Sequence, residues 1–201
     1  MILIENFIKQ FSDVFPNQKD WQPWEVTKNL PSILITLIAD LGDEYEIRNG
    51  IAIHKTAIIE AGAILKDTII IGPNAFVGAN AYLRGGIYLG NSSRIGPGCE
   101  VKTSAIFEKS AVAHFNFIGD SIIGNQVNFE AGSITANHYN ERSDKRIFVL
   151  HKNNILDTGS EKFGTLVGDE SKIGANAVLS PGTILDTGTV VKRLELVEQV
   201  V

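Results

Sequence analysis

The sequence of 201 residues is poor in features that define whole classes of protein. A single cysteine excludes an internal disulfide, and the longest apolar stretches are a handful of residues, far short of the roughly 20 that cross a bilayer. The 18 Lys and Arg residues form no run and are outnumbered by 23 Asp and Glu residues, giving a formal charge of −5. These shortages argue against a membrane-spanning protein and against electrostatic docking on nucleic acid or an anionic membrane.

The first residues also lack the basic and then long apolar segments of a signal peptide, so we expect a cytoplasmic protein. What the sequence has in abundance is isoleucine, valine and glycine, with 19 glycines against one methionine. This mixture favours short extended segments and many tight turns. Length and composition together indicate one globular domain with a small appendage.

A large apolar residue recurs every six residues, at Ile53, Ile59, Leu65, Ile71, Val77, Leu83, Leu89, Ile95, Val101 and Phe107. A second, mostly small residue lies four positions after each, and the same pattern returns from Val167 to Val191. A six-residue period fits neither a helix nor a flat alternating strand. It predicts an all-β solenoid, the hexapeptide-repeat parallel β-helix, in which three hexads make one coil of a prism.

Residues 1–50 follow a helical pattern instead, with apolar residues at i, i+3, i+4 and i+7 in two stretches, residues 4–11 and 33–41. We predict a small helical cap in which Trp21 and Trp24 plug the open end of the first coil, as a solenoid requires. Residues 51–201 then form the β-helix. Within it the repeat breaks over residues 135–166, where alternating apolar residues predict an inserted β-hairpin.

Two cations and one histidine are the candidates for a site. Arg84 and Lys102 both follow a large inward residue and are 18 residues apart, so they should lie on adjacent coils about 5 Å apart at the backbone. Like charges so close are unfavourable unless an anion joins them, although two solvated cations pointing outward are the alternative. His114 lies where the hexad spacing is one residue short, and a packing or surface role is its alternative.

The cysteine and the histidines give no further candidate for a catalytic or metal site. Cys99 occupies the small inward position of its hexad, which indicates a buried, inert thiol. The four histidines, His54, His114, His138 and His151, lie at dissimilar hexad positions, so we predict no metal site.

Residues 82–140 resemble the acetyltransferase domain of the bifunctional glucosamine-1-phosphate acetyltransferase/N-acetylglucosamine-1-phosphate uridyltransferase family. The resemblance is carried by Leu83-Arg84, Glu100-Val101-Lys102, the segment from Ala113 to Ser121, Asn125-Gln126-Val127-Asn128 and the segment from Ala131 to Asn137. Residues 157–182 are similar to archaeal-type sugar-1-phosphate nucleotidylyltransferases with the same C-terminal domain. The resemblance covers about residues 50–192, and it implies a left-handed coil and a homotrimer with active sites between subunits. We expect no nucleotidyltransferase domain.

The resemblance also implies roles for individual residues. His114 would be the general base that deprotonates the amino sugar, and Asn137 would orient the thioester. The substrate-binding residues would be Arg84, Lys102, Phe117, Asn128, His138, Tyr139 and Lys145, with Arg84 and Lys102 holding the sugar phosphate. The acyl carrier would contact Ala131, Ala175 and Arg193. Such residue types suit the reaction, because an ammonium group must lose its proton before it can attack a thioester.

Four positions depart from the family pattern. Phe117 and His138 stand where the family has tyrosine, and Tyr139 follows one residue later. Glu130 replaces a small glycine near the carrier pocket. Lys145 is our assignment for a lysine that the insertion displaces.

The sequence therefore predicts an acyl-CoA-dependent N-acyltransferase, with acetyl-CoA as co-substrate and no tightly bound cofactor, acting on an amino-sugar 1-phosphate or a sugar nucleotide. The alternative is a catalytically silent β-helix that binds a sugar phosphate or serves in assembly. We expect no nucleic-acid or membrane partner.

Overall fold

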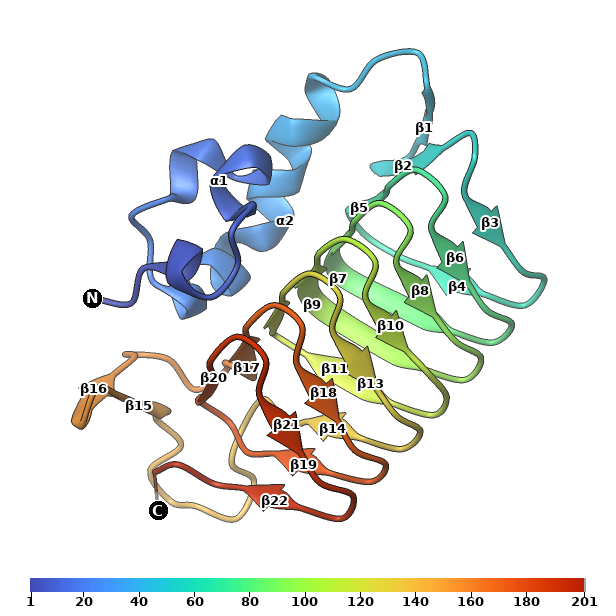
Figure 1. The fold of residues 1–201 in the computed structure, drawn as a ribbon. Helices are drawn as coiled ribbons and strands as arrows, with labels where there is room; N and C mark the ends of the chain where they lie inside the picture. The colour runs from blue at the N-terminus through green and yellow to red at the C-terminus, as the bar shows by residue number, and fades with distance from the viewer. Residues whose placement is uncertain (201) are drawn as a thin grey trace.

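The computed structural model describes residues 1–200 as a three-walled parallel β-helix with helices packed along one wall (Figure 1). Ile58 pairs with Phe76 and Phe76 with Arg94, a step of 18 residues per coil. Three hexads therefore make one coil. The predicted fold, a left-handed β-helix with a helical cap and an inserted hairpin, is confirmed. Val201, the last residue of the predicted domain 51–201, lies outside the described residues.

Wall A is a seven-stranded parallel sheet. In chain order it comprises β3 (Ile58–Ile59), β6 (Phe76–Val77), β8 (Arg94–Ile95), β10 (Ala111–Val112), β13 (Asn128–Phe129), β18 (Lys172–Ile173) and β21 (Val190–Val191). The second residue of each strand points into the prism and the first points outward, because side chains alternate along a strand. The outward row ends in Asn128, Lys172 and Val190.

Wall B follows wall A in each coil, and wall C follows wall B. Wall B comprises β4 (Ile64–Leu65), the first halves of β7 (Tyr82–Leu89) and β9 (Glu100–Ile106), then β11 (Phe117–Gly119), β14 (Ile134–Thr135), β19 (Val178–Leu179) and β22 (Leu196–Val197). Wall C comprises β2 (Ile51–His54), β5 (Ile69–Ile71), the second halves of β7 and β9, then β12 (Ile122–Ile123), β17 (Thr165–Val167) and β20 (Thr183–Leu185).

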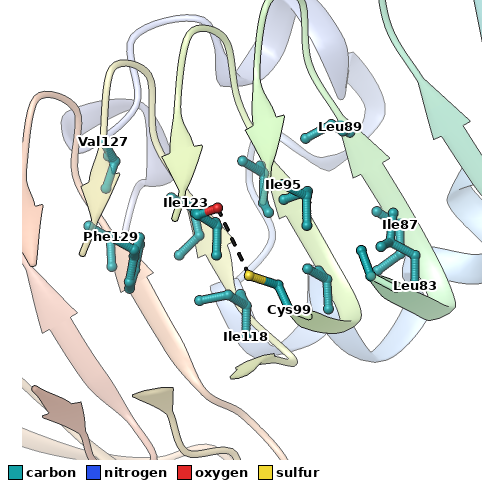
Figure 2. Packing of buried hydrophobic residues seen from close by; sticks show 14 of the residues in the cluster. Leu83, Ile87, Leu89, Ile95, Cys99, Ile118, Ile123, Val127 and Phe129 are labelled. Atoms are coloured by element: carbon teal, nitrogen blue, oxygen red, sulfur yellow. Dashed lines mark hydrogen bonds between the residues drawn. The ribbon is translucent and has the colours of Figure 1, made fainter. Parts of the chain in front are cut away.

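The large residues of the hexads fill the axis of the prism (Figure 2). Leu83, Ile95 and Ile118 are among those with no exposed surface. Cys99 points inward between them and lies 3.6 Å from the amide oxygen of Asn116. Burial raises the pKa of the Cys99 thiol, which agrees with the predicted inert cysteine.

The register slip lies at a different corner from the one that the sequence predicts. The hexad count places Phe107 inside the prism and the slip at His114. In the structure Ile106 is the inward residue, and Phe107 packs outside the prism. The pairing of β7 with β9 shifts in the corner after Arg84. The prediction was wrong because neighbouring apolar residues at 106 and 107 satisfy the same pattern.

The helical cap differs in extent from the prediction. Its elements are η1 (Ile4–Asn6), α1 (Phe11–Val14), η2 (Pro16–Gln18) and α2 (Pro23–Ala39), followed by β1 (Tyr45–Arg48), which pairs antiparallel with β2. Helix α2 begins ten residues before the predicted start. Pro23 suits the first helical turn, and Gln22 and Glu25 close a reciprocal capping box ahead of it.

The cap covers wall C instead of plugging the open end of the first coil (Figure 1). The reason is that wall C is apolar on its outer side, at Ala52, Ile70, Ala105, Ile122, Leu166 and Ile184. Phe11, Phe15 and Leu30 of the cap belong to the same buried cluster. Trp24 contacts Phe163 edge-on, with 6.0 Å between ring centroids. Covering this row removes apolar surface from water, which an end plug would leave exposed.

A buried carboxylate ties the cap to the coil. Asp169, which is 6% exposed, accepts hydrogen bonds from the backbone N–H of Lys9 at 3.2 Å and of Asn125 at 2.7 Å. The side-chain amide of Asn125 donates a further bond to Asp169 at 3.0 Å, and the backbone N–H of Asp169 donates to the carbonyl of Phe7. The N-terminal segment is therefore held by specific polar contacts as well as by its apolar face.

The predicted insertion contains an antiparallel hairpin of β15 (Phe148–His151) and β16 (Asn154–Asp157). Lys152 and Asn153 form its two-residue turn, both with positive φ. Ile147 and Val149 are buried in the cluster that includes the cap. The hairpin thus packs beside the cap along the same side of the coil (Figure 1).

Candidate functional site

The corner between walls A and B stacks four predicted site residues in one column, on four successive coils: His114, Ala131, Ala175 and Arg193. The carbonyls of the first three each accept a backbone N–H from the next coil, at 2.9, 3.0 and 3.0 Å respectively. Coils of this kind are about 4.8 Å apart, so the column is about 14 Å long. The His114 side chain is exposed at one end of it. We call this set the corner column.

Beside the corner column, wall A is hollowed into a groove of about 640 Å³. The groove is lined by Asn128, Glu130, Lys172, Ile173, Gly174, Val190, Val191, Lys192 and Arg193. Asn128, a predicted sugar-binding residue, therefore lies near the residues predicted to contact the carrier. Three cationic side chains face one carboxylate among the lining residues, which favours an anionic ligand.

Glu130 already bonds two of the predicted carrier positions. Its Oε2 accepts the backbone N–H of Ala175 at 2.9 Å, and its two oxygens accept Nε and Nη2 of Arg193 at 2.9 and 3.0 Å. These hydrogen bonds, first from Arg193 and then from Ala175, lower the pKa of the Glu130 carboxyl. Glu130, which replaces a small glycine of the family pattern, thus places its carboxylate on the hydrogen-bond donors that a carrier would use.

The opposite corner, between walls B and C, holds the two predicted cations. Arg84 and Lys102 lie opposite each other on adjacent coils, as their spacing predicts. Each has a carboxylate partner at 2.7 Å, Glu100 for Arg84 and Asp120 for Lys102. The carboxylates supply the compensation that the sequence argument assigned to a bound anion. The Arg84 pair is 36% exposed on both sides, whereas the Lys102 pair is largely buried, at 17% and 9%.

Asn137, His138 and Phe117 belong to this second corner. The Asn137 amide donates to Asp120, and His138 Nδ1 lies 3.3 Å from Asn137 Oδ1. A Cβ on Gly119 would lie 2.7 Å from the Phe117 ring and 3.0 Å from Cγ of Asn137. Glycine at 119 therefore lets the ring and the amide approach each other.

The positions of Tyr139 and Lys145 do not support the predicted role in substrate binding. Tyr139 is 5% exposed, its hydroxyl donates to the carbonyl of Pro181 at 3.1 Å, and the guanidinium of Arg142 lies 3.6 Å from its ring centre. Burial raises the pKa of the Tyr139 hydroxyl. This geometry favours a packing role. Lys145 is exposed in the segment before the hairpin.

Wall B separates the two corners. Lys102 pairs with Gly119 across the coil, and five residues of chain separate Gly119 from His114. His114 lies in the corner before β11 and the two cations lie in the corner after it, so they stand at the two ends of wall B. The structure brings the predicted base together with the carrier residues, and the cations together with Asn137. The predicted site residues therefore fall into two groups, which we call half-sites.

The carboxylates that organise these half-sites, Glu100, Asp120 and Glu130, are not among the predicted site residues. Asp120 lies 18 residues after Lys102, one residue past Gly119, the pairing partner of Lys102 on the next coil, so the repeat carried a signal for that pair. Within residues 1–200, no group of three or more His, Cys, Asp or Glu side chains converges to hold a metal ion. No helix in that part of the chain has the length and apolar character needed to span a membrane.

The three walls and their hexads define the chain as a hexapeptide-repeat β-helix protein. Two protein families match it: the GMPPB C-terminal domain over residues 65–139, and the hexapeptide repeat of succinyl-transferase over residues 158–192.

Among curated proteins, the chain is 32% identical over 145 residues to the bifunctional sugar-1-phosphate nucleotidylyltransferase/acetyltransferase of Sulfurisphaera tokodaii, covering 72% of this chain and 36% of that protein. It is 34% identical over 175 residues to the bifunctional protein GlmU of Methanococcus maripaludis, covering 84% and 41%. These likenesses confirm the resemblance predicted from the sequence: the chain is an acyltransferase-like hexapeptide-repeat domain. It spans about two fifths or less of the length of these relatives.

A solved structure of a mutant perosamine N-acetyltransferase from Caulobacter crescentus, in complex with CoA and GDP-perosamine, is also similar. It is 16% identical, and the match covers 67% of this chain and 50% of that one with a TM-score of 0.23. A likeness this low carries no argument about the site.

Proposed function

We propose that the chain is an acyl-CoA-dependent N-acyltransferase, with acetyl as the acyl group. Its acceptor is the amino group of an amino-sugar 1-phosphate or of a sugar nucleotide. The observation that carries the proposal is the corner column, in which the backbone of His114, a residue with an exposed side chain, is stacked with the three positions assigned to the acyl carrier. A carrier lying along the column would bring its thioester to the His114 end.

The chemistry at that end is a direct transfer. An amino sugar at neutral pH is largely an ammonium ion and has no lone pair with which to attack. His114 takes one proton, and the amine nitrogen then attacks the thioester carbonyl carbon. The new C–N bond forms, the C–S bond breaks, and the thiolate of coenzyme A leaves and takes a proton from the imidazolium. The freed imidazole then accepts the second proton from the acylated nitrogen, which leaves the neutral amide, and releases that proton to water. A hydrogen-bond donor must meet the developing oxyanion, a role that we assign to Asn137.

The acceptor phosphate is assigned to the corner of Arg84 and Lys102. A phosphate there would replace Glu100 at the half-exposed Arg84 more readily than it would replace Asp120 at the buried Lys102. His114 lies at the other end of wall B in the same chain, and the proposal therefore takes the cation corner of a second copy to abut the His114 corner of the first.

A homotrimer is the assembly that we infer, because a closed ring of three such contacts uses both corners of every chain. The cap already covers wall C, which leaves the other two walls to meet a neighbour. Exposed apolar side chains on and beside wall B support this contact, namely Ile64, Phe115 and Leu196, which are 49%, 76% and 62% exposed.

The test is thiol release from acetyl-CoA with glucosamine 1-phosphate as acceptor. We expect His114→Ala to lower kcat by at least about a hundredfold, because general base catalysis contributes that much or more. His54→Ala is the matched control, since it makes the same substitution on β2 of wall C, outside both corners, and it should leave kcat unchanged. Thiol release that His114→Ala leaves unchanged would refute His114 as the base.

A second candidate is a catalytically silent module that binds a sugar phosphate. The observation that favours it is Glu130, which occupies the donors of Ala175 and Arg193. This candidate predicts measurable binding of glucosamine 1-phosphate without thiol release for any amino sugar or acyl chain tried. The acyltransferase proposal predicts binding of glucosamine 1-phosphate together with thiol release.

A further inference from the structure

Two glutamates occupy equivalent places in the β-helix, at the end of wall A on different coils. Oε2 of Glu60 accepts the backbone N–H of Ala79 at 2.7 Å, and Oε2 of Glu130 accepts that of Ala175 at 2.9 Å. A glutamate at this place therefore satisfies an N–H of the following coil. What distinguishes Glu130 is Arg193, one coil further on, which grips the carboxylate with two nitrogens.

The charge of the groove makes this grip unusual. Lys172 and Lys192 line the same groove as Arg193, and Glu130 is the one carboxylate among its lining residues. Positive side chains therefore outnumber carboxylates three to one in the lining, and the carboxylate of Glu195, outside the lining, accepts the backbone N–H of Lys192 at 2.7 Å. A ligand with several negative charges would neutralise the groove better than Glu130 does. Phosphate esters with two or more charges have this property.

Exposure shows that the Glu130 pair is exchangeable. The side chains of Arg193 and Glu130 are 73% and 37% exposed, so water and small anions reach both. The Lys102 and Asp120 pair, at 17% and 9%, has no comparable access. An exposed ion pair is weak and is screened by salt, so an incoming phosphate competes with it on similar terms.

We propose that the groove on wall A binds the phosphate groups of the acyl carrier, and that Glu130 is a built-in competitor for them. Glu130 holds the guanidinium of Arg193 and the N–H of Ala175 until a phosphate displaces it. The inference rests on the proposed function, because it takes the carrier to be a coenzyme A thioester. Glu130 then sets the affinity of the site and its selectivity for carriers rich in phosphate.

The experiment is calorimetric titration of the wild-type chain, Glu130→Gln and Glu60→Gln with two probes, coenzyme A and inorganic tripolyphosphate. Glutamine keeps one oxygen for the N–H of Ala175, removes the charge, and replaces the oxygen that accepts Nη2 of Arg193 with an NH2 group of the same size. We expect Glu130→Gln to bind both probes about threefold to tenfold more tightly at low ionic strength, with the gain fading at about 0.5 M salt. Glu60 has no arginine partner, so the affinity of Glu60→Gln for each probe should stay within about twofold of the wild-type affinity. Circular dichroism checks that all three are folded.

The outcomes separate the inference from the proposed function. A gain for tripolyphosphate without any binding of coenzyme A would support Glu130 as a competitor and refute the coenzyme A carrier. Equal affinities of wild type and Glu130→Gln for both probes, weaker binding by the variant, or no binding by any chain would overturn the competitor role. Thiol release that persists in those cases would leave the acyltransferase proposal intact.

Discussion

Replacing Asp169 with alanine should weaken the attachment of the helical cap to the coil. Asp169 is the buried acceptor on which Lys9 of the cap and Asn125 of the preceding coil converge. Alanine removes both of the oxygens that accept these bonds. The backbone N–H of Asp169 still reaches the carbonyl of Phe7, so the variant loses only part of the attachment.

The magnitude follows from the groups left without a partner. Asn125 is 7% exposed, and it would lose acceptors for its backbone N–H and its side-chain amide. An unsatisfied buried donor costs about 1–3 kcal/mol, and the Lys9 N–H is accessible enough to find water. We therefore expect a loss of about 2–4 kcal/mol, which corresponds to about 1–2 M in the urea midpoint.

Tryptophan fluorescence gives a specific assay, because both tryptophans, Trp21 and Trp24, lie in the cap. The fluorescence transition of Asp169→Ala should shift by the full amount, while the circular dichroism of the strands should shift less. Asp157→Ala is the control. This exposed carboxylate accepts one backbone N–H, from Gly159, and pairs with Arg146 at 3.2 Å, and its loss should cost under about 1 kcal/mol. Equal effects of the two substitutions, or a fluorescence midpoint unchanged in Asp169→Ala, would refute the argument.

Two further predictions concern the coil itself. A Cβ on Gly96 would overlap the carbonyl oxygen of Ala113 on the next coil, so Gly96→Ala should cost about 3 kcal/mol or prevent folding in urea titrations, whereas Gly42→Ala, which meets no neighbour within 4 Å, should be tolerated. Cys99 is buried and its pKa is raised, so its thiol should react with Ellman's reagent only in denaturant, and rapid labelling of the native chain would contradict the packing.

The sequence predicted the coil because its signal is repeated at every turn. One inward position in each hexad must be apolar, and nine of the ten predicted hexads, all but that of Phe107, are independent observations of this rule. The position of the cap had a signal in the sequence too. Residues such as Ile70, Ile122 and Ile184 form an apolar row on the outer side of wall C. An apolar outer row requires a cover, and the N-terminal residues are the cover.

The stacking of the half-sites was partly predictable. Arg84 and Lys102 lie a whole coil apart, so their spacing gives their contact. The pair of Glu130 and Arg193 lies 63 residues apart, which is no multiple of a coil. The insertion between them hides the register, although the strands on either side of it still pair directly. Side-chain pairing across such an insertion needs coordinates.

This separation of scaffold and insertion explains why the corners carry the candidate chemistry. A two-residue strand has one inward side chain, which the core fixes, and one outward side chain. Residues in the corners are not bound by this alternation. An insertion at one corner leaves the pairing of the walls unchanged. Residues from distant parts of the chain, such as His114 and Arg193, can therefore share one column. The acyltransferase proposal predicts that substitutions along that column change carrier binding. It also predicts that substitutions in the corner between walls B and C, which contains Arg84, change acceptor binding.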